Sequence, residues 1–202
     1  MKRMFLYLSA FALIGLMAFK SIDLPIGARL PKADVRMKDV SGKEVTLKGA
    51  MKTNGLLVMF SCNTCPYVIK NQARTLEAGK YAEASKIGVV LVNSNEALRS
   101  EEDSYNAMKA YAKEQHYNFN YVMDAKSVIA DAFGATRTPE CFLFNKEGKL
   151  VYHGAIDDNP SDPNAVTRKH LKEAMDEMVA GKDITIKTSR SVGCGIKRVK
   201  ND

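Results

Sequence analysis

The sequence has few cysteines and no concentration of basic residues, and both features narrow what the protein can be. Four cysteines among 202 residues are too few for a small domain packed by disulfides. The formal charge of +7 comes from 30 basic and 23 acidic residues that are interspersed along the chain. A nucleic-acid footprint would need the basic residues gathered on one face, so we expect no nucleic-acid partner. The chain also has no internal repeat and no low-complexity segment.

The N-terminus has an apolar run, but the run is short. The basic pair Lys2-Arg3 precedes an uncharged stretch over residues 4–19, and no cysteine follows closely enough to carry a lipid. The stretch falls short of the roughly 20 apolar residues that cross a bilayer comfortably. This layout is typical of a secretory signal peptide. We predict a signal peptide over residues 1–21, or an N-terminal membrane anchor if it stays uncleaved, and an exported, periplasmic or otherwise extracytoplasmic protein.

The remainder, residues 26–202, is predicted to be one α/β domain with a C-terminal tail. Continuous apolar runs such as residues 56–60 are too short for helices and are typical of buried strands. Strands are expected at 35–40, 44–47, 56–60, 89–92, 120–123, 141–144 and 150–153, and helices from 65–66, after 101–104, at 127–133 with Ser127 as cap, and over 171–179. The first two strands predict an N-terminal β-hairpin. Alternating strands and helices then imply a parallel crossover and a central sheet with helices on both faces.

The stretch "FSCNTCPY" places Cys62 and Cys65 between a buried strand and a helix that begins near Pro66. Unpaired N–H groups and the helix dipole stabilise a thiolate at such a point, and the thiolate is the reactive form of cysteine. The first cysteine is expected to be exposed before the first turn, and the second to be more covered. This geometry assigns Cys62 as the attacking nucleophile and Cys65 as the resolving thiol of a disulfide-exchange couple.

A second stretch, "TRTPECFLF", places Thr138-Pro139 just before a buried strand, as a candidate cis-proline turn. A strand, a C-x-x-C-P turn and a helix, followed about seventy residues later by Thr-Pro and a strand, resemble the thioredoxin fold. The resemblance implies that Thr138 and Pro139 face Cys62 and bind substrate. The backbone of Thr138 would then pair with an extended substrate peptide.

More specific motifs narrow the resemblance. "CPYV", "NSN", "EDS", "TPE-FLF", "YHGAIDD" and a terminal "GC-IK" are similar to a peroxiredoxin-like thioredoxin family within the redoxin (AhpC/TSA-like) superfamily, over roughly residues 27–198. The resemblance implies a thiol–disulfide oxidoreductase without a cofactor. Its substrates would be protein or small-molecule disulfides, and a separate redox partner would recycle Cys62 and Cys65.

The chain departs from the thioredoxin pattern at two points. Thioredoxins have a buried Asp in the strand before the C-x-x-C, whereas no acid occurs between Met51 and Cys65 here. Glu140 beside the cis-proline candidate is a potential substitute proton acceptor, as in cytochrome-maturation reductases; the alternative is an exposed strand-end carboxylate. The Asn63-Thr64 interior of the turn also differs, so no redox potential can be carried over.

Hydroperoxide reduction is the first alternative function. Peroxiredoxins carry a Pro-x-x-x-Thr/Ser-x-x-Cys-Pro pattern whose hydroxyl orders the peroxide. Aligning Cys65-Pro66 to this pattern puts Cys62 in place of the hydroxyl and Val58 in place of the first proline. These two mismatches weaken the peroxidase interpretation and leave it open.

The other two cysteines and the metal-binding alternative carry less information. Cys141 lies on a predicted core strand, where a packing role is expected. Cys194 lies in the Gly-Cys-Gly of the tail. It is either an ordinary free or structural cysteine, or an auxiliary thiol that resolves a disulfide or pairs with Cys141.

C-x-x-C is also half of a zinc site, but the other half is missing, so no metal is expected. A copper carrier with a Cys pair and His153 is the remaining, less favoured alternative.

Overall fold

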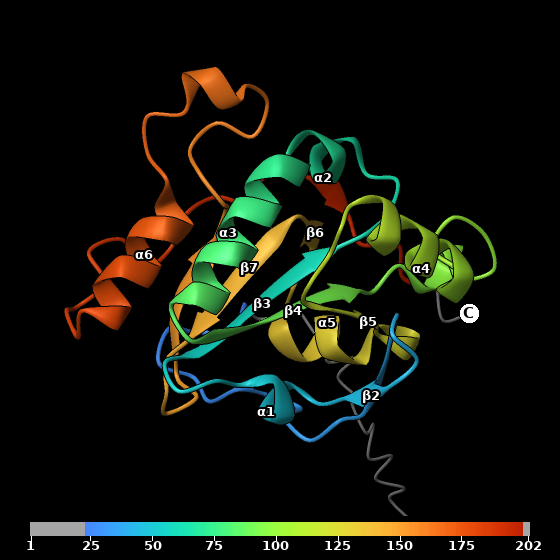
Figure 1. Ribbon diagram of the computed structural model, residues 1–202, viewed down its shortest axis with the longest axis horizontal. Helices are drawn as coiled ribbons and strands as arrows, with labels where there is room; N and C mark the ends of the chain where they lie inside the picture. The colour runs from blue at the N-terminus through green and yellow to red at the C-terminus, as the bar shows by residue number, and fades with distance from the viewer. Residues whose placement is uncertain (1–22, 200–202) are drawn as a thin grey trace, which may run out of the picture.

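The computed structural model describes residues 23–199, and a seven-stranded mixed sheet forms its centre (Figure 1). The strand order is β2-β1-β5-β4-β3-β7-β8, and a separate pair, β6 with β9, lies beside it. The strands are β1 (Met37–Asp39), β2 (Glu44–Val45), β3 (Gly55–Ser61), β4 (Ile87–Asn93), β5 (Asn120–Met123), β6 (Arg137–Thr138), β7 (Glu140–Phe144), β8 (Leu150–Gly154) and β9 (Cys194–Gly195).

Six α-helices and three short 3-10 turns connect these strands. They are α1 (Leu47–Ala50), α2 (Pro66–Lys70), α3 (Gln72–Ala84), η1 (Glu96–Leu98), α4 (Tyr105–Glu114), η2 (Ala125–Ser127), α5 (Val128–Phe133), η3 (Pro163–Ala165) and α6 (His170–Val179). Within residues 23–199 no helix is both long and apolar enough to span a bilayer. The predicted signal peptide lies outside the described residues.

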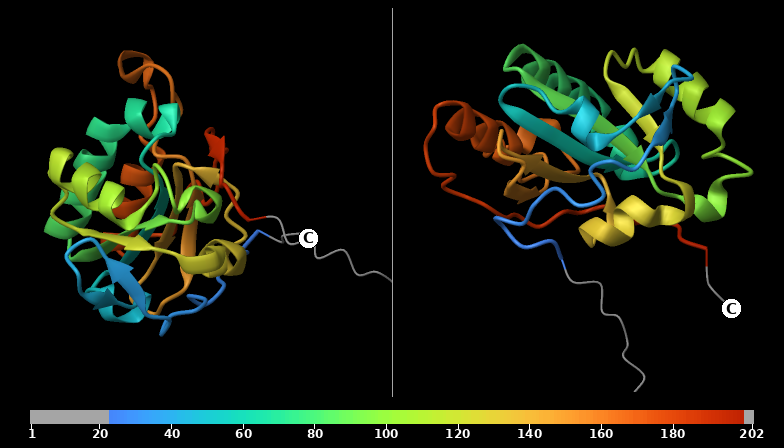
Figure 2. Two further views of the ribbon diagram at one scale, coloured as in Figure 1. Left: turned by 90° about the vertical axis from the view of Figure 1, so that its right-hand side faces the viewer. Right: turned by 90° about the horizontal axis from the view of Figure 1, so that it is seen from below.

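The predicted α/β architecture is confirmed. β3, β4 and β5 run parallel, β7 pairs antiparallel with β3, and β8 pairs antiparallel with β7 at that edge of the sheet. The hairpin of β1 and β2 joins the other edge through β5. Helices α3, α4 and α6 cover one face, while α1 and α5 cover the other (Figures 1 and 2). This is the thioredoxin-like arrangement that the sequence predicted.

Strand β3, which leads into the cysteine turn, is buried along its whole length. Leu57 and Met59 pack under α3 and α6, and Val58 and Phe60 pack against α5 on the opposite face. Burial of each such side chain contributes about 1.5–3 kcal/mol relative to exposure. The last residue of β3 is therefore held rigidly at the centre of the sheet.

Ser127 occupies the N-cap position of α5, as predicted, but its side chain does not cap the helix. Ser127 has a left-handed backbone conformation, with φ of 55°, and its hydroxyl donates to the carbonyl of Ser94 at 2.7 Å. Asp124 takes over the capping role, because its carboxylate accepts the N–H groups of Ile129 and Ala130 at 2.9 and 3.0 Å. A buried carboxylate satisfies these free helix amides more strongly than a hydroxyl would.

The C-terminal tail is part of the folded structure. After α6 the chain returns along β8, where Ser189 N donates to His153 O at 3.1 Å. It then forms β9 against β6, with Thr138 opposite Cys194 and Arg137 opposite Gly195 (Figures 1 and 2). This pairing brings residues 193–196 to the cis-proline loop.

Candidate functional site

The two cysteines of the C-x-x-C turn occupy the predicted place. Strand β3 ends at Ser61, and α2 begins at Pro66 with Cys65 as its N-cap residue. Proline suits the first helical position because its missing N–H would have had no partner there. Cys62, Cys65 and Val68 form a small buried cluster at this end of the sheet.

The cis-proline loop faces these cysteines, as expected. The Thr138–Pro139 peptide bond is cis. The Cys62 sulfur lies 3.4 Å from the hydroxyl oxygen of Thr138, and the Cys65 sulfur lies 3.3 Å from the carbonyl oxygen of the same residue. Residues more than seventy positions apart in the chain therefore form one site.

The expected exposure of Cys62 is wrong. Cys62 is 1% exposed and Cys65 is 4% exposed. The tail is one cause, because Cys194 packs against the pair and β9 occupies the free edge of Thr138. This is also the edge at which a substrate peptide was expected to pair.

The tail is anchored by several hydrogen bonds on either side of Cys194. Ile196 N donates to Thr136 O at 3.0 Å, and Lys197 N donates to the side-chain oxygen of Asn95 at 2.9 Å. The guanidinium of Arg198 pairs with Asp131 at 2.7 Å. Cys194 is thus held in register opposite Thr138.

The two thiols of the turn differ in their electrostatic surroundings. Hydrogen bonds from the Cys62 thiol, the Cys194 thiol and the backbone N–H groups of Val68 and Cys194 lower the pKa of Cys65 to about 4, against the effect of burial. The hydrogen bond to Cys65, burial and the charge of Asp103 raise the pKa of Cys62. These surroundings favour negative charge on Cys65, at the start of the helix, over negative charge on Cys62.

A buried acid lies beside the cysteine turn, and the sequence analysis missed it. Asp103 is fully buried, and its carboxylate accepts from the backbone N–H of Asn63 at 3.0 Å. The side-chain amides of Asn93 and Asn95 donate to the same carboxylate at 2.7 and 2.8 Å. The acid that is absent upstream of Cys62 is thus supplied by the loop before α4.

The signal for this cluster was present in the motifs. Asn93 and Asn95 belong to "NSN", and Asp103 belongs to "EDS", which we interpreted only as an acidic helix start. The same cluster extends into the turn, since Tyr121 OH donates to the side-chain oxygen of Asn63 at 2.8 Å. Polar residues that follow separate strand ends meet at the carboxyl edge of a parallel sheet.

Glu140 is not the exposed carboxylate of the alternative interpretation, because it is 5% exposed. One carboxylate oxygen lies 2.8 Å from the ring nitrogen Nε2 of His153. The other accepts the backbone N–H groups of Thr136 and Arg137 at 2.8 and 3.1 Å. The carboxylate thereby shapes the approach to the cis-proline loop; its role as a proton acceptor stays a prediction.

The structure separates the remaining candidates from the thiol pair. Cys141 is fully buried in the core under α3 and α6, as predicted for a packing role, and lies in a different cluster from Cys194. His153, proposed as a copper ligand, stacks on Phe142 with 4.1 Å between ring centroids and directs Nε2 to Glu140. The face of the His153 ring and its Nε2 atom therefore both have partners within the sheet.

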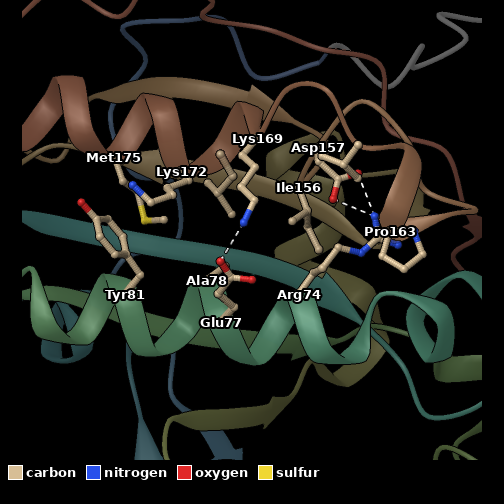
Figure 3. Close-up of a pocket in the computed structure, with 12 residues that line it drawn as sticks. Arg74, Glu77, Ala78, Tyr81, Ile156, Asp157, Pro163, Lys169, Lys172 and Met175 are labelled. Carbon is tan, nitrogen blue, oxygen red and sulfur yellow. Dashed lines mark hydrogen bonds and ion pairs between the residues drawn. The ribbon is translucent and has the colours of Figure 1, made fainter.

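A pocket lies between α3 and α6 (Figure 3), and no cysteine lines it. At one end Arg74 forms a buried ion pair with Asp157 at 2.7 Å, and Lys169 bridges to Glu77 across the opening at 3.0 Å. None of the predicted site residues lines it. These bridges hold α3 against the segment that leads into α6.

The mixed sheet, the C-x-x-C turn at a helix start and the opposed cis-proline define a thioredoxin-fold protein with a buried dithiol. A family model described as Redoxin matches residues 25–169, and the chain belongs to the Redoxin family.

Individual proteins are similar to this chain in sequence or structure. The thiol-disulfide oxidoreductase ResA of Bacillus subtilis is 29% identical over 115 residues, and the match spans 57% of this chain and 60% of the relative. An uncharacterized conserved protein from Geobacillus kaustophilus has a TM-score of 0.82 at 30% identity, covering 89% of this chain and 95% of that one. A hypothetical protein from Sinorhizobium meliloti has a TM-score of 0.81 at 32% identity, covering 89% and 98%.

Proposed function

We propose that the protein is an exported thiol–disulfide oxidoreductase that cycles Cys62 and Cys65 between dithiol and disulfide. The observation that carries the proposal is that both sulfurs contact Thr138, one at its hydroxyl and one at its carbonyl oxygen, at the start of a helix. The relative ResA, whose name describes this activity, supports the same class of reaction. Protein or small-molecule disulfides would be the substrates, and a separate redox partner would recycle the pair.

Cys62 is proposed to attack the substrate disulfide and Cys65 to resolve the mixed disulfide. In the resting pair the Cys62 thiol donates to Cys65, so attack requires this proton to move to Cys65. The geometry supports the transfer, because a protonated Cys65 can donate to Thr138 O and a Cys62 thiolate can accept from the Thr138 hydroxyl. Release of the substrate thiol then leaves the Cys62–Cys65 disulfide.

Hydroperoxide reduction is the second candidate, and the lowered pKa of Cys65 favours it. In this reaction the Cys65 thiolate attacks the peroxide O–O bond and is oxidised to a sulfenic acid, while the other oxygen leaves and is protonated to an alcohol or water. The sulfenic acid then condenses with the Cys62 thiol to form a disulfide and water. Cys65 is the residue that aligns with the reactive cysteine of the peroxiredoxin pattern.

One set of assays separates these functions. Turnover of a protein disulfide and of a hydroperoxide is measured for the full chain and for Cys62→Ser and Cys65→Ser, with Cys141→Ala as the control. We expect disulfide turnover to fall by about a thousandfold or more in both serine variants and to persist in the control. Disulfide turnover that survives both substitutions contradicts the proposal.

Three further outcomes would change the proposed function or its residue roles. Peroxide attack that needs Cys65 and proceeds without Cys62 in a single turnover supports the peroxidase function. Tight stoichiometric copper binding without either turnover supports a metal carrier. Attack on the substrate disulfide by Cys65 in the Cys62→Ser variant, with no attack by Cys62 in the Cys65→Ser variant, reverses the roles of the two cysteines.

A further inference from the structure

The substrate reaction proposed above uses Cys62 and Cys65 and leaves the third cysteine near the site, Cys194, without an assigned role. Its side chain packs against the cluster that Cys62 and Cys65 form with Val68, and its thiol hydrogen-bonds with the Cys65 sulfur. It is also the most exposed of the three thiols, because Cys62 and Cys65 are buried. A thiol in this position is placed to connect the buried pair to the surface.

The tail positions Cys194 by shape as well as by hydrogen bonds. A side-chain carbon added at Gly193 would lie 2.1 Å from Thr138 O, so only glycine permits this close approach to the cis-proline loop. The same addition at Gly195 would meet nothing closer than Thr136 O at 3.9 Å. The tail therefore makes its close approach to the cis-proline loop at Gly193, directly before Cys194.

We propose that Cys194 is a third redox thiol that exchanges with the Cys62–Cys65 disulfide by attacking the Cys65 sulfur. The Cys194 thiol loses its proton, the Cys65–Cys194 bond forms, the Cys62–Cys65 bond breaks, and Cys62 leaves as a thiolate that takes up a proton. One disulfide is consumed and one is formed, so the step needs no oxidant. The proposal rests on the proposed disulfide-exchange function.

The product of this step is the form that a recycling partner can reach. A partner dithiol attacks the Cys194 sulfur, Cys65 departs as a thiolate, and the second thiol of the partner releases Cys194 by forming the partner's own disulfide. A thiol with a low pKa is the better leaving group, and the hydrogen bonds around Cys65 provide this property. In the oxidative direction the same steps run in reverse.

The linkage is tested directly in the full chain. Protein equilibrated in a glutathione redox buffer is quenched with acid, alkylated, digested and mapped by mass spectrometry. We expect Cys62→Ser to form an internal Cys65–Cys194 disulfide, and the unsubstituted chain to contain both this bond and Cys62–Cys65. The proposal is overturned if Cys62→Ser instead carries glutathione on Cys65 while Cys194 stays free.

The role of the docked tail is tested in the Cys62→Ser background with a matched pair of glycine variants. Gly193→Ala should lower the effective concentration of Cys194 at Cys65 by at least about tenfold, measured from the glutathione concentration that opens the bond. Gly195→Ala should change it little, because its added methyl group meets no close neighbour. Equal effects of the two variants, with folding verified by circular dichroism, would contradict the assigned geometry.

Turnover separates this inference from the function on which it rests. Pre-reduced full chain and Cys194→Ser are each given one equivalent of a protein disulfide, and both should reduce it in a single turnover. With thioredoxin, its reductase and NADPH as the recycling dithiol system, repeated turnover of Cys194→Ser should be at least about tenfold slower. Failure of the single turnover in the unsubstituted chain refutes the proposed function, whereas equal repeated turnover refutes only the inference.

Discussion

The turn after β3 contains the buried Cys65, and strand β7 contains the buried Cys141. The surroundings of these two cysteines shift their pKa values in opposite directions. Around Cys65 the other thiols and two backbone N–H groups lower the pKa to about 4. Around Cys141, burial among apolar side chains raises the pKa, and neighbouring carboxylates add to this effect. Burial alone therefore does not make a cysteine inert. The hydrogen-bond donors at a helix start decide which buried thiol carries charge.

The largest expected difference between the two regions is the acid titration of their thiols. Reduced protein should lose one thiolate, followed by absorbance near 240 nm, with a midpoint at about pH 4. The signal should disappear in Cys65→Ser and persist in Cys141→Ala. Because the pKa of Cys65 is lowered on folding, its thiolate contributes stability that is complete above the unfolded pKa and is lost as pH falls through about 4. A midpoint near 9 would contradict the comparison.

The second prediction concerns the acid that supports the cysteine turn. Asp103→Asn places an amide N–H₂ among three donors that all point at the carboxylate. We expect a loss of about 2–4 kcal/mol in the free energy of unfolding, measured by urea denaturation. The control is Asp34→Asn, whose surface pair with Lys48 is exposed and should contribute less than about 1 kcal/mol. Equal losses in the two variants would show that the buried cluster has no special role.

Much of the fold could be predicted because it depends on local patterns. The short apolar runs marked β3, β4 and β7, and proline after Cys65 marked the start of α2. The site was harder to predict where it depends on contacts between distant segments. Asp103 looked like an ordinary helix-start acid, and Cys194 looked like a thiol on a flexible tail. Neither pattern contains the backbone path that brings these residues to the cysteine turn, so their roles required the three-dimensional structure.

A third prediction distinguishes the two buried acids near the site. Glu140→Gln keeps an oxygen for the backbone N–H groups of Thr136 and Arg137 and can donate to His153, so unfolding should change by about 1 kcal/mol or less. As the proposed proton acceptor, its loss should slow disulfide exchange by about tenfold or more and change the pH dependence of the rate. A pH–rate profile identical to that of the unsubstituted protein would remove Glu140 from the mechanism.

The smallest effects are expected at Cys141. They test whether this cysteine has only a packing role, in contrast to Cys65. Cys141→Ala removes one buried sulfur and should cost about 1 kcal/mol through the space it leaves. Cys141→Ser keeps nearly the same shape but buries a hydroxyl among apolar neighbours, and should cost about 1–3 kcal/mol if no partner is found. Disulfide turnover should remain unchanged in both variants, because this sulfur lies in a separate cluster from Cys62 and Cys194. Thermal and urea unfolding measure the loss of stability in each of the two variants.

A turnover loss that exceeds the loss expected from the unfolded fraction would mean that the core of β7 is coupled to the thiol pair. In that case the difference between the two cysteines would no longer separate a reactive region from a packing region.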